Sequence, residues 1–207
     1  MGLAAAASGT GPAPVVGGPG NGTATGTGPV AAEVKLRAQR HVRVGNPVAI
    51  RGRVTPSGAR AVVIKVGDRK VRTVHSDREG SFRARWRASG AGVYRVTAVA
   101  RGTGSARRAE SPPVRVNAYR AAAASYYGPG LYGGGLACGG TLRPGTIGVA
   151  NRSLACGTRL TLRYGRRSVR VEVIDRGPFS GHREFDLTAA TRARLGFPST
   201  GIVLSTR

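Results

Sequence analysis

The most constraining feature of this sequence is a period-two alternation of apolar and polar residues, repeated in short runs from about residue 31 onward. This alternation is the pattern of β-strands that bury one face. The clearest run alternates the apolar Phe82, Ala84 and Trp86 with Arg83, Arg85 and Arg87. Glycine and proline turn signals separate the runs at intervals of about 8–12 residues. The sequence therefore predicts an all-β protein.

The runs between residues 31 and 118 predict an N-terminal domain of about seven short strands, which is typical of an immunoglobulin-like β-sandwich. The pattern, with the turn Gly80-Ser81-Phe82, resembles the immunoglobulin-like modules of bacterial secreted proteins. Trp86 is expected to fill the core of this sandwich. Residues 1–30 are rich in Gly, Ala, Pro and Thr and predict a disordered tether. Residues 119–124 are expected to link the sandwich to a second domain.

The chain is strongly basic, with 33 Lys and Arg against 9 Asp and Glu and a formal net charge of +24. Such a charge favours polyanionic partners: nucleic acid, anionic cell-wall polymers or acidic lipid. The arginines, however, alternate along predicted strands rather than gathering into one dense patch with interleaved aromatics. Solvated strand faces are therefore predicted, without a specific nucleic-acid site.

The two cysteines, Cys138 and Cys156, both lie in the C-terminal part of the chain. They form no Cys-x-x-Cys motif and the three histidines are scattered, so no metal site is predicted. A Cys138–Cys156 disulfide formed in an oxidising compartment is the simplest interpretation, with two buried free thiols as the alternative. No run of about 18 apolar residues predicts a membrane span. Met1–Ser8 lacks the pattern of a signal peptide.

A carboxylate stands at the end of the predicted strand Ser168–Asp175. Asp175 shares its face with three alternating valines, and Gly177-Pro178 then forces a turn. Partial desolvation at the edge of an apolar face would raise the pKa of this carboxyl, as a general acid requires. The alternative is that Asp175 caps the turn by accepting hydrogen bonds from backbone N–H groups.

Four motifs occur in one order in the C-terminal part of the chain: Ser125-Tyr126-Tyr127-Gly128, Asn151-Arg152-Ser153-Leu154, Asp175-Arg176-Gly177-Pro178 and Phe185-Asp186-Leu187. In type and order they resemble the RlpA (rare lipoprotein A) family of double-psi β-barrels, which is more distantly related to expansins and barwin-like domains. The resemblance covers residues 125–207. It implies a six-stranded double-psi β-barrel with a short helix, expected at Ala189–Leu195 with Thr188 or Asp186 as its cap.

The resemblance also implies a function. Family members bind peptidoglycan glycan strands outside the cytoplasm, and some are lytic transglycosylases that leave a 1,6-anhydro-muramic product. In that chemistry one carboxyl protonates the leaving oxygen and then, as a base, helps the sugar's own 6-hydroxyl to attack. The matching residue here is Asp175, and Asp186 is the nearest candidate for a partner carboxylate. A secreted or cell-wall monomer without a cofactor is expected.

Three further residues are candidates for substrate binding. Tyr126 and Tyr127, beside glycines, would form a sugar-stacking platform, or else pack the barrel. Arg176 would steady the ionised carboxylate or bind an anionic group of the glycan; a surface salt bridge is the alternative.

Two positions depart from the family pattern. Asn151 stands where the family usually has a histidine; it can hydrogen-bond a sugar or orient Asp175 but cannot shuttle protons. Gly140 stands where the family usually has a glutamate. A second hypothesis is therefore a non-catalytic, expansin-like module that binds glycan or loosens the wall.

Overall fold

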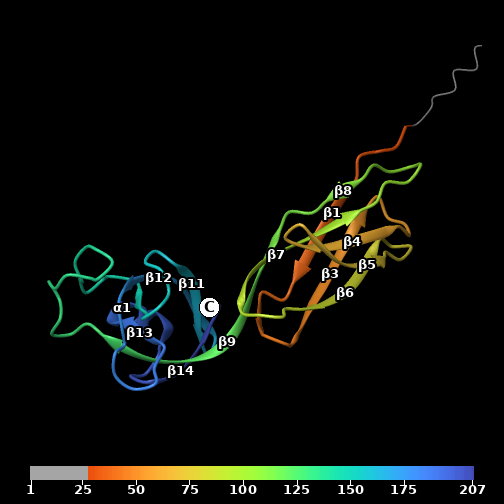
Figure 1. Ribbon diagram of the computed structural model, residues 1–207. Coiled ribbons are helices and arrows are strands. Elements are labelled where there is room, and N and C mark those ends of the chain that lie inside the picture. Colours follow the sequence, from red (N-terminus) through yellow and green to blue (C-terminus); the bar gives the residue numbers. More distant parts are fainter. Residues whose placement is uncertain (1–27) are drawn as a thin grey trace, which may run out of the picture.

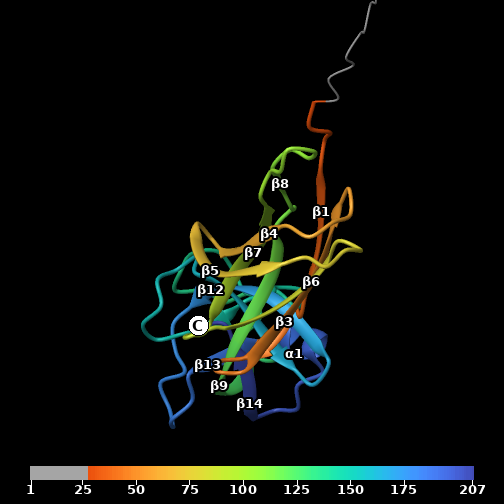
Figure 2. The same ribbon diagram turned by 90° about the vertical axis from the view of Figure 1, so that its right-hand side faces the viewer.

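The computed structural model describes residues 28–207, so nearly all of the expected N-terminal tether lies outside the described residues. The described part is built from fourteen β-strands and one short α-helix. The strands form two bodies, one from each half of the chain, joined by the long strand β9 (Figure 1). The view turned by 90° shows β9 running from one body into the other (Figure 2). The predicted all-β class is confirmed.

The N-terminal body is a sandwich of two sheets. One sheet is antiparallel and consists of β1 (Glu33–Ala38), β3 (Pro47–Thr55) and β6 (Ser81–Arg87). The second consists of β4 (Ala61–Val66), β5 (Arg69–His75), β7 (Gly92–Ala100) and the first part of β9 (Val114–Tyr127), with β2 (His41–Arg43) and β8 (Ala109–Glu110) as short additions.

The alternating apolar side chains of both sheets meet in one core, as the sequence pattern requires. Val48, Ile50, Val62 and Ile64 are among its fully buried members. Trp86 is half-buried and packs against this core edge-to-face with Tyr94, at 5.0 Å between ring centroids. The sequence therefore places the sandwich core correctly.

Strand β9 belongs to both bodies. Its first residues pair with β7 and β2, and the segment 120–127 then pairs with β14 and β13. Residues 119–124, expected to form a linker, are thus the middle of a 14-residue strand. At this crossing Nδ1 of His41 and the hydroxyl of Tyr119 are hydrogen-bonded at 2.7 Å. The two bodies have separate cores, and we propose that their boundary falls inside β9.

The C-terminal body is a closed barrel of six strands. After β9 come β10 (Val149–Ala150), β11 (Arg159–Tyr164), β12 (Arg167–Asp175), β13 (Phe185–Thr188) and β14 (Gly201–Ser205). The pairings run β9–β13–β10–β12–β11–β14 and return to β9, with β10–β12 and β9–β13 parallel. Closure removes free sheet edges and surrounds a core that includes Leu162, Val173, Phe185 and Leu187.

The single helix, α1 (Ala189–Leu195), lies where the sequence predicts it. Thr188 is the N-cap, and its hydroxyl accepts a hydrogen bond from the backbone N–H of Thr191 at 3.2 Å. Gly196 ends the helix in the left-handed region, at φ +63°, which glycine adopts without strain. Of the two expected caps, Thr188 therefore serves and Asp186 does not. Within residues 28–207 no helix is long and apolar enough to cross a membrane.

The arginines are less dispersed than the sequence suggests. Alternation along one strand puts its arginines on one face, and the antiparallel register of β1, β3 and β6 puts the arginines of all three strands on the same face of one sheet. The sequence predicts solvated strand faces without a dense patch of arginines and interleaved aromatics, and no aromatic side chain lies among these exposed arginines. It does not predict their gathering on one face of the sheet, because cross-strand register is not visible in the sequence.

We expect Leu162→Ala to lower the free energy of unfolding by about 2–5 kcal/mol, because Leu162 is fully buried in the barrel core and its truncation leaves a cavity. Denaturant unfolding of the full chain measures the change. Ile202→Ala is the matched control: Ile202 lies on β14 but is 55% exposed, and its truncation should change stability by less than about 0.5 kcal/mol. Equal losses in the two variants would contradict the barrel packing described here.

Candidate active site

The site is organised around Asp175, the last residue of β12. Val171 and Val173, which share its face, are buried in the barrel core, as the alternation predicts. Asp175 itself is half-buried and pairs with Ala150 of β10 at an irregularity in the register. The fold therefore delivers this carboxyl to the rim of the barrel, where the strand ends.

Backbone groups hold the carboxyl of Asp175 in one orientation. Its Oδ1 accepts a hydrogen bond from the N–H of Ala137 at 2.9 Å and another from the N–H of Arg176 at 2.8 Å. The expected turn-capping role is thus present. Within the described residues no donor makes a hydrogen bond of normal geometry to Oδ2, so one oxygen is fixed by backbone groups while the other is left for an external group.

Tyr127, at the end of β9, is an ionisable neighbour that the fold brings to Asp175. Its hydroxyl is buried and has no hydrogen bond of normal geometry among residues 28–207. Burial raises the pKa of Tyr127 well above its usual value, and the charge of Asp175, hydrogen bonding to Asp175 and the charge of Asp186 raise it further. The phenol therefore stays protonated, with its O–H in the field of two carboxylates.

Asp186, on β13, is the second carboxylate of the site. Its Oδ1 accepts a hydrogen bond from the hydroxyl of Ser125 at 2.7 Å. Burial is the main reason that the pKa of Asp186 is raised, and the negative charge of Asp175 adds to it. The bond from Ser125 and the positive charge of Arg183 act in the opposite direction without cancelling the rise. The structure thus places Asp186 close enough to Asp175 for their charges to interact, and a catalytic partnership of the two carboxylates stays a prediction.

The side chain of Asn151 hydrogen-bonds to backbone groups of the neighbouring loops and makes no hydrogen bond to the side chain of Asp175. Its Oδ1 accepts hydrogen bonds from the N–H groups of Ser153 at 3.0 Å and Leu154 at 2.7 Å. Its Nδ2 donates to the backbone oxygen of Glu184 at 2.9 Å. The side chain is buried and its polar atoms are engaged with backbone groups, so the structure offers Asn151 a positioning role through the loop rather than contact with substrate.

Arg176 also points into this loop. Its Nη1 donates to the backbone oxygens of Asn151 at 3.0 Å and Leu154 at 2.8 Å, and its Nη2 lies 3.1 Å from the sulfur of Cys156. Among the described residues the guanidinium forms no surface salt bridge, and its binding of an anionic glycan group stays a prediction. It fastens the segment 151–156 against the end of β12.

The predicted disulfide between Cys138 and Cys156 is present, with Cα atoms 5.5 Å apart. It joins the loop that carries Ala137 to the loop that carries Asn151. Since Ala137 donates to Asp175, the disulfide ties one of the two donors of the carboxyl to the loop held by Arg176. The bridge thus belongs to the support of the site.

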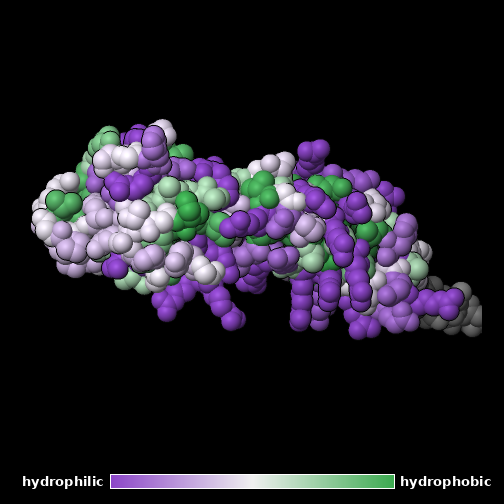
Figure 3. Space-filling model, turned by 90° about the horizontal axis from the view of Figure 1, so that it is seen from below, coloured by the Kyte–Doolittle hydropathy of each residue, from purple (hydrophilic) through white to green (hydrophobic). Residues whose placement is uncertain are grey.

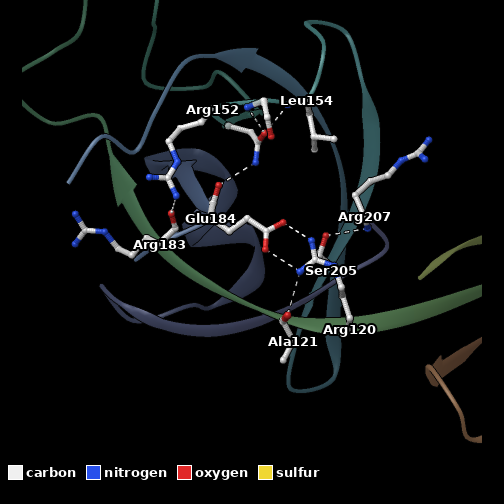
Figure 4. Close-up of polar contacts among 10 residues, drawn as sticks. Arg120, Ala121, Arg152, Leu154, Arg183, Glu184, Ser205 and Arg207 are labelled. Atoms are coloured by element: carbon white, nitrogen blue, oxygen red, sulfur yellow. Dashed lines mark hydrogen bonds and ion pairs between the residues drawn. The ribbon is translucent and has the colours of Figure 1, made fainter. Parts of the chain in front are cut away.

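A further ion pair lies beside the site, between Arg120 of β9 and Glu184. Figure 4 shows the guanidinium of Arg120 facing both carboxylate oxygens; Nη1 lies 2.7 Å from Oε2. The backbone of this segment also accepts a bond from Arg152, at 3.2 Å from the oxygen of Arg183. These contacts hold the chain that leads into β13 and Asp186.

The two tyrosines do not form a common platform, because neighbours in a strand point to opposite faces. Tyr126 packs on the barrel core, and the guanidinium of Arg192 lies 4.4 Å from its ring centroid. The exposed aromatic rings on the loop that donates to Asp175 and on the loop that follows it are instead Tyr132, 40% exposed, and Phe179, 81% exposed. Phe179 stands four residues after Asp175, and Tyr132 lies in the loop that includes Ala137. Sequence reasoning missed both because exposure of a ring in a loop leaves no periodic signal.

Within residues 28–207 no group of three or more His, Cys, Asp and Glu side chains could hold a metal ion. A cavity lies between the sandwich and the barrel, where Trp86 and Leu160 are among its lining residues. Asp175 does not line this cavity and is partly exposed at the rim of the barrel, where β12 ends.

Comparison with known proteins gives matches for the barrel. A double-psi β-barrel family described as "Lytic transglycolase" matches residues 120–204. A protein of Synechocystis sp. named "Probable endolytic peptidoglycan transglycosylase RlpA" is 40% identical over 100 residues, covering 42% of this chain and 31% of that protein. A protein of Nostoc sp. with the same name is 39% identical over 83 residues, covering 38% of this chain and 22% of that protein.

This chain thus spans less than a third of the length of either relative. The matches confirm the resemblance of the C-terminal half to RlpA-like double-psi β-barrels. They do not bear on the type of the sandwich, and its immunoglobulin-like assignment stays a prediction.

We expect Asp186→Asn to stabilise the protein at neutral pH relative to its stability at low pH. Because the pKa of Asp186 is raised on folding, ionising this carboxyl costs more in the folded than in the unfolded state. The cost is absent below the unfolded value of 3.8 and grows as pH rises through the folded value. The difference in Tm between variant and parent, measured from pH 3 to 8 (roughly the span of carboxyl titration), should therefore increase with pH.

Ser125→Ala tests the cause of this shift. The Ser125 hydroxyl donates to the ionised carboxylate and lowers its pKa, so its removal should raise the pKa of Asp186 further. In the Ser125→Ala background, Asp186→Asn should bring a larger gain at neutral pH. A gain independent of pH in both backgrounds would contradict the assignment.

Proposed function

We propose that this chain, whose residues 120–204 form an RlpA-like double-psi β-barrel domain, binds peptidoglycan glycan strands and cleaves them as a lytic transglycosylase. The proposal rests on one observation above all: Asp175 is held by two backbone donors with Oδ2 left for a substrate. The printed name of the two relatives supports the reaction class. Action outside the cytoplasm is part of the proposal and agrees with the disulfide.

In the proposed reaction the protonated carboxyl of Asp175 donates its proton to the glycosidic oxygen as the bond to C1 of the muramic sugar breaks. Positive charge then develops on the ring, as in other glycosidic cleavages. The sugar's own 6-hydroxyl attacks C1, and the carboxylate of Asp175 takes up the hydroxyl proton. The products are a 1,6-anhydro-muramic end and a new free hydroxyl, so a single carboxyl completes the cycle.

Tyr127 and Asp186 support this cycle through Asp175. A phenol that stays protonated can donate a hydrogen bond to the carboxylate formed after the first proton transfer. Asp186 lies close enough for its charge to interact with that of Asp175, so it contributes to the electrostatic field of the site. We therefore assign Tyr127 as a positioning residue and not as part of a sugar platform.

Glycan contacts in this proposal come from the exposed rings of Tyr132 and Phe179. Aromatic faces suit the C–H surfaces of sugars, and the two rings stand on loops that flank Asp175. An open rim also accommodates a long glycan strand, which passes through a site rather than entering a closed pocket.

The second candidate is a glycan-binding barrel without catalysis. It is favoured by the chemistry of two positions, since neither Gly140 nor the engaged side chain of Asn151 can transfer a proton. Gly140 also has φ +84°, a conformation in which a glutamate would be strained. The two candidates differ in a single observable, the release of product.

We expect the full chain to release fragments with 1,6-anhydro-muramic ends from peptide-free glycan strands, as read by mass spectrometry. Asp175→Asn should lower the rate by a factor on the order of 10²–10⁴, the usual contribution of a general acid–base, and leave binding to the strands intact. Tyr127→Phe should lower the rate by about tenfold and shift its pH profile, because it removes the buried phenol hydroxyl that is proposed to donate to the carboxylate of Asp175 during the reaction.

Asp68→Asn is the matched control, since it removes one exposed carboxylate from the sandwich and should leave the rate unchanged. Product from Asp175→Asn at the parental rate would reject Asp175 as the acid. Binding by parent and variants alike, with product from none of them, would establish the glycan-binding barrel instead.

A further inference from the structure

One face of the sandwich carries a dense set of cations, which we call the arginine face. It is the outer face of the β1–β3–β6 sheet, whose inner face contributes Val34, Ile50 and Phe82 to the core. All of its cationic side chains are exposed: Lys35, Arg37, Arg51, Arg53, Arg83, Arg85 and Arg87. Figure 3 shows long hydrophilic side chains projecting side by side from the sandwich end of the molecule.

The register aligns three of these cations across the sheet. Arg37 lies directly opposite Arg51, and Arg51 lies directly opposite Arg83. Directly opposed residues in antiparallel strands have Cα atoms about 5 Å apart, and like charges in such pairs destabilise a sheet. None of the three guanidinium groups has a hydrogen bond or ion pair within residues 28–207. The row is thus an unfavourable arrangement for the isolated protein.

Acidic groups do little to offset this charge. The carboxylate on the arginine face is Glu33, which pairs with Lys35 at 3.9 Å at the end of β1. Arg53 and Arg87 donate to the backbone oxygens of Glu79 and Gly45, which leaves their positive charge uncompensated. An excess of fixed positive charge therefore faces solvent.

The positive surface continues toward the barrel. Arg87 also lines the cavity between the sandwich and the barrel, together with Arg115, Arg159 and Arg170. A long anionic chain lying on the arginine face can therefore extend from β6 into this cleft. The surface is larger than a single small anion needs, which favours a polymer.

The chemistry of the face restricts the kind of polyanion. Guanidinium groups present two parallel donors to phosphate oxygens, and six of the seven cations are arginines. The other side chains of the face are Pro47, Ala49, Thr55 and Ser81, so it has no aromatic ring on which a nucleic-acid base could stack. It also has no exposed large apolar side chain to enter a lipid interface.

We propose that the arginine face binds a linear, base-free phosphodiester polymer of the cell wall. The location in the wall rests on the proposed function, whereas the binding surface is independent of the barrel and its chemistry. Repeating phosphates match a row of repeating cations, and occupancy relieves the repulsion within that row. Binding there raises the local concentration of the barrel beside its glycan.

The test uses the full chain and purified poly(glycerol phosphate), with binding measured by calorimetry at several salt concentrations. The variant Arg37→Gln/Arg51→Gln/Arg83→Gln removes the row. We expect binding at least about tenfold weaker and a salt slope smaller by about 2, because three phosphate contacts are lost. The same variant should have a Tm higher by about 2 °C, because the opposed like charges are gone.

The matched control is Arg43→Gln/Arg72→Gln/Arg101→Gln, which removes the same charge from exposed positions on other elements. It should keep most of the affinity. If both variants lost the same affinity for the polymer, binding would depend on net charge alone, and the proposal would be overturned. Tighter row-dependent binding of single-stranded DNA, of a carboxylate polysaccharide or of phosphatidylglycerol vesicles would overturn it in favour of that partner. Asp175→Asn should bind the polymer normally, which separates this proposal from the catalytic one.

Discussion

The closing of the barrel by β9 is the constraint on which the rest of the structure depends. This strand pairs with β13 in parallel and with β14 antiparallel, so the ring of six strands is complete only when β9 is in place. The same pairing sets Ser125 opposite Asp186 and carries Tyr127 to the rim beside Asp175. Barrel closure and assembly of the candidate site therefore depend on the same strand pairing.

The polar residues around Asp175 act mainly on the backbone. Asn151 hydrogen-bonds to loop carbonyl and N–H groups, Nη1 of Arg176 donates to two carbonyls of the same loop, and the disulfide joins that loop to the one that donates to Asp175. Buried polar groups need such partners, because an unpaired one costs about 1–3 kcal/mol. The carboxyl is thus oriented by a rigid frame of main chain rather than by a mobile catalytic partner.

Much of this could be predicted from the sequence, because strand alternation and helix capping are local. The valines of β12, the bounds of α1 and the capping of a turn by Asp175 follow from short-range rules. What the sequence could not provide is direction in space. Local sequence does not predict that the Arg176 guanidinium bonds to the loop 151–156 or that Tyr126 and Tyr127 point to opposite faces of β9. It also does not predict that Arg37, Arg51 and Arg83 lie opposite one another across three strands. These depend on loop path and cross-strand register, which long-range pairing decides.

The continuity of β9 also bears on where this protein can be divided. A barrel fragment that began at residue 125 would lack the residues of β9 that pair with Gly201–Ser205 of β14. Its last strand would become an open edge with unpaired N–H and C=O groups, a template for aggregation. A sandwich fragment that ended at residue 113 would lose the strand that pairs with β7 and β2. A division between Tyr119 and Arg120, by contrast, leaves each half the residues of β9 that it pairs with, so recombination that exchanges one half between proteins has to break the chain at this point inside a strand.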